Sequence, residues 1–165
     1  MKKAMMGLLS VGIIAALTVA PAWSQGRKTE MSLNLGVQTN IWNGTSFDNA
    51  WFTLDLRVGV PLGAKFELAP ELMYATDDSL DFSWHNLYPG VLVNYRSGGF
   101  FAGAGLVLPI GFGEGESDTA SPSPKINLGY NVGKFKLTAY FLMFLDSGLD
   151  FLDMNQAGIT LGYRF

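Results

Sequence analysis

Apolar and polar side chains alternate along residues 51–60, WFTLDLRVGV. One face of this stretch carries Phe52, Leu54, Leu56, Val58 and Val60, and the other carries Thr53, Asp55, Arg57 and Gly59. An extended strand places successive side chains on opposite faces, so a period of two predicts a β-strand with one apolar and one polar face.

The same period returns in seven further segments: residues 29–38, 65–76, 86–95, 100–110, 126–132, 135–143 and 157–165. An even number of antiparallel strands can close into a barrel in which every backbone group is paired. A soluble sandwich or lipocalin-type barrel would turn its apolar face inward and leave the charged face outside. Here the second face carries charges and many glycines, so we predict an all-β fold: a transmembrane, antiparallel, up-and-down β-barrel of eight strands.

The connections between these segments alternate in length. Residues 62–64, 97–99 and 133–134 are tight turns, whereas residues 40–50, 77–83, 111–124 and 145–155 are longer loops. In such barrels short turns face the periplasm and long loops face outside. The four long loops contain no Lys or Arg, and they hold Asp48, Asp77, Asp78, Asp81, Glu114, Glu116, Asp118, Asp146, Asp150 and Asp153. Four basic residues lie at the opposite rim: Lys65, Arg96, Lys134 and Arg164.

The composition argues against an ordinary soluble domain. The 165 residues suffice for one domain, and 48% are hydrophobic against 15% charged, where an ordinary soluble domain has about 25% charged residues. The absence of Cys excludes disulfides, thiolate metal sites and thiol nucleophiles.

The N-terminus has the features of a secretory signal peptide. Lys2 and Lys3 precede an apolar run over residues 4–20, and small residues follow at Ala22 and Ser24. We predict a signal peptide over residues 1–24 and a barrel domain over residues 25–165, with cleavage after Ala22 and a retained anchor as the alternatives. Cleavage leaves nine basic and 14 acidic residues, a net charge of 9 − 14 = −5. An acidic chain of this kind argues against nucleic acid as a partner.

The C-terminal segment carries a recognisable pattern in Ile159, Leu161, Tyr163 and the terminal Phe165. It resembles the closing strand of bacterial outer-membrane barrels, and the chain from about Thr29 onward is similar to the outer-membrane β-barrel family of small OmpA-, OmpX- and OmpW-like proteins. The resemblance implies that this strand is read by the barrel assembly machinery. It also implies an outer-membrane location in a Gram-negative-type bacterium.

Six charged side chains are expected to face the lumen: Asp55, Arg57, Glu67, Glu71, Lys136 and Arg164. A hairpin centred on Gly63 would place Arg57 diagonally between Glu67 and Glu71, with Asp55 opposite Glu71. The interior of an eight-stranded barrel is just wide enough for side chains to fill, so we expect a packed network of ion pairs. The alternative is a narrow path for small solutes between small inward residues.

Three prolines fall within consecutive strands: Pro70, Pro89 and Pro109. Each removes one backbone donor from the sheet. They would form a lateral seam if the missing hydrogen bonds lined up, and otherwise they sit at bulges or strand rims.

His85 is the only histidine, and Ser83 and Asp81 or Asp78 lie near it in sequence. A hydrolytic site needs a nucleophile, a base and an orienting acid within reach. No motif around Ser83 matches such a site, so His85 is expected to be a polar rim residue. We expect no catalytic residue, cofactor or metal site, since the loop acids Asp146, Asp150 and Asp153 match no calcium-loop spacing.

The sequence therefore favours a monomeric, non-enzymatic barrel with a structural or surface-interaction role, whose partners are outer-membrane lipids, including lipopolysaccharide. A lipid-handling barrel, such as a lipid A-modifying enzyme or a hydrophobic-solute transporter, is the first alternative. A narrow channel is the second.

Overall fold

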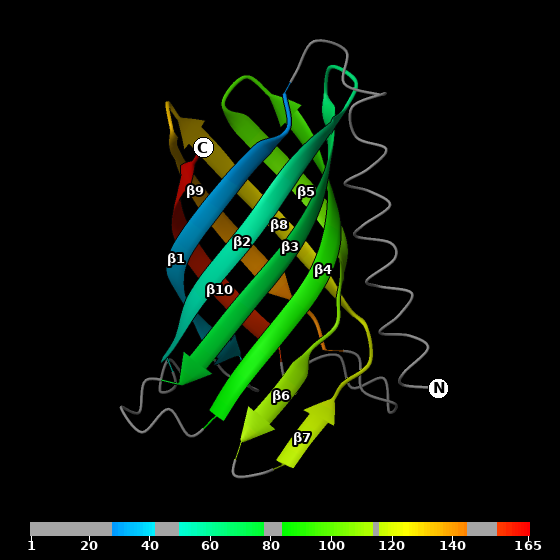
Figure 1. The fold of residues 1–165 in the computed structure, drawn as a ribbon, viewed down its shortest axis with the longest axis vertical. Helices are drawn as coiled ribbons and strands as arrows, with labels where there is room; N and C mark the ends of the chain where they lie inside the picture. Colours follow the sequence, from blue (N-terminus) through cyan, green and yellow to red (C-terminus); the bar gives the residue numbers. More distant parts are fainter. Residues whose placement is uncertain (1–27, 42–49, 78–83, 114–115, 145–154) are drawn as a thin grey trace.

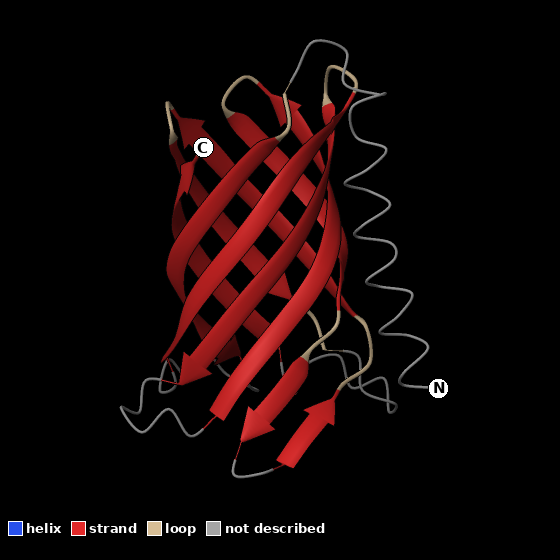
Figure 2. Ribbon diagram, viewed as in Figure 1, coloured by secondary structure: helices blue, strands red, loops and turns tan. Residues whose placement is uncertain are grey.

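The computed structural model describes residues 28–41, 50–77, 84–113, 116–144 and 155–165. Strands make up almost all of these residues (Figure 2). They are β1 (Glu30–Ile41), β2 (Ala50–Leu62), β3 (Phe66–Asp77), β4 (Trp84–Ser97), β5 (Phe100–Val107), β6 (Ile110–Gly113), β7 (Glu116–Thr119), β8 (Ser123–Val132), β9 (Phe135–Leu142) and β10 (Asn155–Arg164). Among the described residues, no helix is long and apolar enough to cross a membrane.

Eight of the strands close into a barrel. They follow one another in the order β1, β2, β3, β4, β5, β8, β9 and β10, and β10 pairs with β1 to complete the ring. All pairings are antiparallel, and the strands are tilted against the barrel axis (Figure 1). The predicted eight-stranded, up-and-down topology is confirmed.

The barrel is apolar on the outside and polar within. Leu35 and Leu161 on the outer face are 64% and 59% exposed, whereas Asp55 and Arg57 on the inner face are 1% and 2% exposed. A soluble domain has the opposite distribution, because burying a charge away from water is costly unless the charge is paired.

The three tight turns lie at one end of the barrel together with the C-terminus (Figure 1). We call this the short-turn end, and the opposite end the loop end. Each turn contains a glycine in the left-handed region, Gly63 with φ 80°, Gly98 with φ 60° and Gly133 with φ 58°. Other residues rarely adopt this conformation, so glycine permits the sharp reversal at each position.

The β2–β3 hairpin has a different register from the predicted one. Leu62 pairs with Phe66 and Arg57 pairs with Glu71, so the turn is centred on Ala64 and Asp55 lies opposite Met73. A shift of two residues leaves the same side chains facing inward, so the alternation of the sequence does not distinguish the two registers.

Residues 111–124, expected as a loop, include a short hairpin of β6 and β7. This hairpin projects at the loop end (Figure 1). β6 pairs with β4 in line with β5, since Leu87 pairs with Ile110 and Gly90 with Val107. Two residues, 108 and 109, separate β5 from β6, whereas three residues, 120–122, separate β7 from β8. The extra residue makes a one-residue bulge before β8. The residues of β7, ESDT, are all polar, so this strand has no apolar alternation by which the sequence could reveal it.

The burial of one residue of this segment differs from the prediction. Leu108 was expected to face outward, but it is only 3% exposed. It lies where the chain leaves the regular ladder between β5 and β6, and its backbone N–H still donates to the carbonyl of Pro89 at 2.9 Å.

Candidate functional site: the charged lumen

The middle of the lumen holds a buried chain of ion pairs. Arg57 Nη2 lies 3.0 Å from Asp55 Oδ2 and 2.7 Å from Glu71 Oε2. Lys125 Nζ lies 2.6 Å from the other oxygen of Glu71, and 4.5 Å from the centroid of the Tyr140 ring. The four charged side chains are each at most 2% exposed. We call them the central network.

The positions of these residues in their strands explain why the four charged side chains meet. Arg57 of β2 and Glu71 of β3 are direct cross-strand partners, and Lys125 reaches them from β8 across the barrel. Asn34 of β1 adds an amide donor to Asp55 Oδ2 at 3.2 Å. Charge-assisted hydrogen bonds of this kind offset part of the cost of removing each charge from water.

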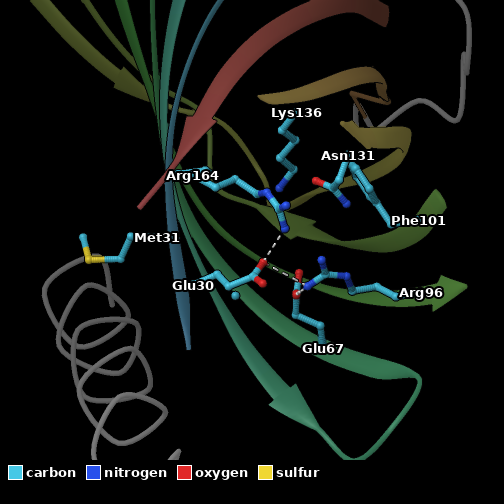
Figure 3. Close-up of a pocket in the computed structure, with 10 residues that line it drawn as sticks. Glu30, Met31, Glu67, Arg96, Phe101, Asn131, Lys136 and Arg164 are labelled. Carbon is cyan, nitrogen blue, oxygen red and sulfur yellow. Dashed lines mark hydrogen bonds and ion pairs between the residues drawn. The ribbon is translucent and has the colours of Figure 1, made fainter. Parts of the chain in front are cut away.

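A second cluster lies at the short-turn end (Figure 3). Glu30 Oε2 accepts from Arg164 at 2.9 Å and from Arg96 at 3.2 Å, so one carboxylate bridges two guanidinium groups. Arg96 also pairs with Glu67, to which Asn94 donates at 3.2 Å. We call Glu30, Glu67, Arg96 and Arg164 the mouth network. Its members are more exposed than the central network, with Glu30 at 36%.

Lys136 lies beside the mouth network without a carboxylate of its own. Within the part of the chain that the structure describes, no acidic oxygen comes within 4.0 Å of its Nζ atom. Its ammonium group instead lies 4.8 Å from the centroid of the Phe101 ring, and the residue is 6% exposed. Lys136 is therefore a buried cation held by an aromatic face.

The loop end of the lumen changes from charged to neutral and then to apolar. Tyr140 donates to Gln38 Oε1 at 2.9 Å, and Tyr88 donates to Gln156 Oε1 at 3.2 Å. Buried apolar side chains pack around the two tyrosines; they are Met73, Ala75, Val107 and Leu142, with Trp51 and Phe144 partly buried against them.

Side chains fill the lumen between these layers. A cavity at the short-turn end, lined by Glu30, Arg96, Lys136 and Arg164 among others, has a volume of about 10 Å³ (Figure 3). That is room for about one water molecule. Several buried polar atoms in the lumen, among them Arg57 Nε and Asp55 Oδ1, have no hydrogen-bond partner in the protein, and water is the usual partner of such groups.

The structure places five of the six charged residues of the sequence hypothesis in two clusters, and Lys136 beside the mouth network. Asp55, Arg57 and Glu71 belong to the central network, and Glu67 and Arg164 to the mouth network. Each of these five has a carboxylate or guanidinium partner. The diagonal pairing of Arg57 with Glu67 is wrong, because the register places Arg57 directly opposite Glu71.

Sequence reasoning missed three lumen charges: Glu30, Arg96 and Lys125. Lys125 lies one residue before the predicted strand, which began at residue 126, yet it shares the inward parity of Asn127. Extending the alternation by one residue would have found it. Glu30 and Arg96 are strand-end residues, whose direction depends on where each strand meets its turn.

The three prolines lie in different settings. Pairing of β3 with β4 is continuous from Phe66 to Thr76, past both Pro70 and Pro89. Pro109 lies between β5 and β6, where its carbonyl accepts from Ala120 at 3.0 Å. The register of β2 with β3 has a gap at residues 58 and 59, opposite residues 69 and 70, so this ladder is interrupted beside Pro70.

His85 contacts a tyrosine. Tyr74 Oη lies 2.6 Å from His85 Nδ1, and the two rings stack with centroids 5.8 Å apart. The Ser83 and aspartate partners considered for it lie outside the described residues, as do the predicted signal peptide and most of the loop acids: Asp48, Asp78, Asp81, Glu114, Asp146, Asp150 and Asp153.

The C-terminal aromatic residues form a cluster on the outer wall. Tyr163 meets Phe135 and Phe165 edge to face, with ring centroids 5.9 and 5.4 Å apart. Ile159 and Leu161 point outward on the same strand, 49% and 59% exposed.

No protein-family model and no curated protein sequence matches this chain. Solved structures that share its fold include the following three. Neisserial surface protein A has a TM-score of 0.60 at 10% identity over 82% of this chain and 95% of that one. A de novo designed transmembrane β-barrel has a TM-score of 0.56 at 13% identity over 86% and 100%. Ail, the attachment invasion locus protein of Yersinia pestis, solved with the heparin analogue sucrose octasulfate, has a TM-score of 0.54 at 17% identity over 84% and 100%.

Proposed function

We propose that this protein is an outer-membrane β-barrel that anchors acidic loops at the surface of a Gram-negative-type bacterium and acts in structure or surface interaction. The observation that carries the proposal is the inverted polarity of the barrel. Its outer wall exposes large apolar side chains, while its lumen buries charges such as Arg57 and Lys125. A closed barrel with this polarity satisfies its backbone internally and matches a lipid environment.

A packed lumen favours an anchoring role over transport. The central network and the apolar layer on its loop-end side occupy the interior. The cavity of about 10 Å³ at the short-turn end has room for about one water molecule. The known fold hosts many activities, so the role rests on this lumen and on the loops rather than on the likeness to other barrels.

The loops point to the chemistry of the partner. The long loops hold ten acidic residues and no basic ones. Such a surface repels polyanions and attracts cations. We therefore infer a partner with a basic surface, or lipopolysaccharide phosphates bridged to the loops by divalent cations, in contrast to Ail, which was solved with a sulfated ligand.

A charge on the outer wall tests the membrane location. Leu35 lies in the middle of β1 and is 64% exposed. In a bilayer, Leu35→Arg should destabilise the folded barrel by about 2–4 kcal/mol, measured by urea unfolding in phosphatidylcholine vesicles. The matched control is Ser97→Arg, which adds the same charge at the exposed last residue of β4. Equal stability of the two variants would contradict the proposal, because an exposed leucine in water tolerates this change.

A further inference from the structure

Two clusters of lysine and aromatic side chains lie on the outer wall at the short-turn end. In the first, Lys65 Nζ lies 6.0 Å from the centroid of the Tyr95 ring, and Tyr95 meets Phe66 edge to face at 5.7 Å. We call these three residues the Lys65 cluster. Lys65 lies in the β2–β3 turn.

The second cluster repeats this arrangement on another part of the wall. Lys134 Nζ lies 5.4 Å from the centroid of the Tyr163 ring, and Tyr163 meets Phe135 and Phe165 edge to face. We call these four residues the Lys134 cluster. Lys134 lies in the β8–β9 turn, at the same end of the barrel as the β2–β3 turn (Figure 1).

Lys65 and Lys134 lie on the outer wall, and their charges are not neutralised by a described acidic residue as most basic charges in the lumen are. Among the described residues, neither Lys65 nor Lys134 forms an ion pair, whereas Arg57, Arg96, Lys125 and Arg164 each do. Both lysines are exposed. Each therefore presents a positive charge with free hydrogen-bond donors at the edge of the apolar wall.

The surroundings identify the matching ligand. Tyrosine and other aromatic residues of barrels lie at the level of the lipid headgroups, and a lysine beside them reaches the same depth. The acceptor found at that depth is the phosphate of a phospholipid. The strand ends that lead into the acidic loops lie at the other end of the barrel (Figure 1), and both clusters of lysine and aromatic rings on the described wall lie at the short-turn end.

We propose that the Lys65 and Lys134 clusters are two binding sites for the headgroup phosphates of anionic phospholipids in the leaflet at the short-turn end. The lysine supplies the charge, the tyrosine hydroxyl supplies a further donor, and the phenylalanines contact the upper part of an acyl chain. This inference rests on the proposed membrane location, and it names the lipid class and the leaflet.

Native mass spectrometry of the full chain, folded in mixed micelles with equal phosphatidylglycerol and phosphatidylcholine, tests the two sites. We expect the wild type to retain phosphatidylglycerol preferentially. Lys65→Gln and Lys134→Gln should each lower the retained ratio of the two lipids roughly fivefold, and the double variant should lose the preference. Lys65→Arg with Lys134→Arg should keep it, because the charge is conserved.

Lys28→Gln is the matched control, since Lys28 is exposed, lies two residues before β1 and belongs to neither cluster. An equal loss of preference in this control would overturn the proposal, because net charge alone would then explain the selectivity. A wild type without preference would overturn it too. Displacement of the lipid by an excess of glycerol 3-phosphate would show that the sites take a free phosphate instead.

Insertion into phosphatidylcholine vesicles is measured first and separates the two proposals. A wild-type chain that does not insert counts against the membrane location itself. A chain that inserts but shows no preference for phosphatidylglycerol counts against the lipid sites alone.

Discussion

Glu71 holds two buried cations in place. One of its oxygens accepts from Arg57 and the other from Lys125, and none of the three side chains is more than 2% exposed. The central network is therefore sensitive to the loss of this one carboxylate, because, of its acidic partners among the described residues, Arg57 would keep Asp55 alone and Lys125 would keep none.

Glu71→Gln should destabilise the folded barrel by about 3–5 kcal/mol, since removing one partner of a buried ion pair leaves uncompensated charge. Urea unfolding in lipid vesicles measures this loss. Glu30→Gln is the control, because Glu30 also bridges two cations but is 36% exposed, and exposed pairs contribute about 1 kcal/mol or less. If both variants lost equal stability, burial would not be the cause.

The two buried lysines of the lumen, Lys136 and Lys125, allow a second comparison of stability. Both lie in the lumen, but Lys125 pairs with Glu71 and Lys136 contacts the Phe101 ring. We expect Lys136→Met to leave stability unchanged or to raise it, because the substitution removes a desolvated charge that has no carboxylate partner in the described part of the chain. Lys125→Met should lower it by about 3–5 kcal/mol. A loss in Lys136→Met as large as in Lys125→Met, in the same urea titration, would mean that Lys136 is equally well paired.

At the scale of elements, small residues allow strands and side chains to approach closely inside the narrow barrel. A side chain added at Gly105 of β5 would overlap the backbone carbonyl oxygen of Val91 in β4. At Gly111 of β6 the nearest atom to an added Cβ would be the side-chain oxygen of Asn86, at 3.2 Å. The first contact involves paired backbone, which moves only if the β4–β5 ladder shifts.

Gly105→Ala should therefore cost about 1–3 kcal/mol of stability through overpacking. Gly111→Ala, the control in the neighbouring element, should change stability by much less, because the asparagine side chain can move. Thermal unfolding of the two variants in the same detergent gives the comparison. A Gly105→Ala variant as stable as the wild type would show that β4 and β5 can separate at this level.

The β6–β7 hairpin shows how far an element can extend beyond its hydrophobic signal. Its pairing with β4 keeps the register of β5, and a one-residue bulge connects it to β8. On the short-turn side of this bulge, β5 pairs directly with β8 and closes the barrel wall. The hairpin is thus an addition at the loop end, and the ring of eight strands is complete without it.

At the scale of the whole molecule, the barrel combines a lumen filled by side chains with an apolar outer wall. Because side chains of the central network and the apolar layer fill the interior, we expect purified protein in planar bilayers to show no stepwise conductance. Regular conductance steps would instead support the narrow-channel alternative. A heat-modifiable band on an unboiled gel of the same sample provides the control that the barrel is folded.

Local alternation along the chain was enough to predict the eight strands of the barrel and, away from the strand ends, which face of each meets the lumen. A period of two is a local property, so it can be read from each segment alone, as in the outward leucines and inward Asp55 and Arg57 of β2. The mature N-terminus and the function of the loops remain predictions.

The alternation pattern left open which charges are partners, and the folded arrangement of all the strands settles it. Arg57 could have faced Glu67 diagonally or Glu71 directly, because registers that differ by two residues bury the same face. The β2–β3 turn selected Glu71. Closure of the ring then carried Lys125 of β8 to the same carboxylate, 54 positions from Glu71 in the chain. Local alternation fixes the direction of a side chain, whereas its partner across the lumen depends on the register of every strand between them.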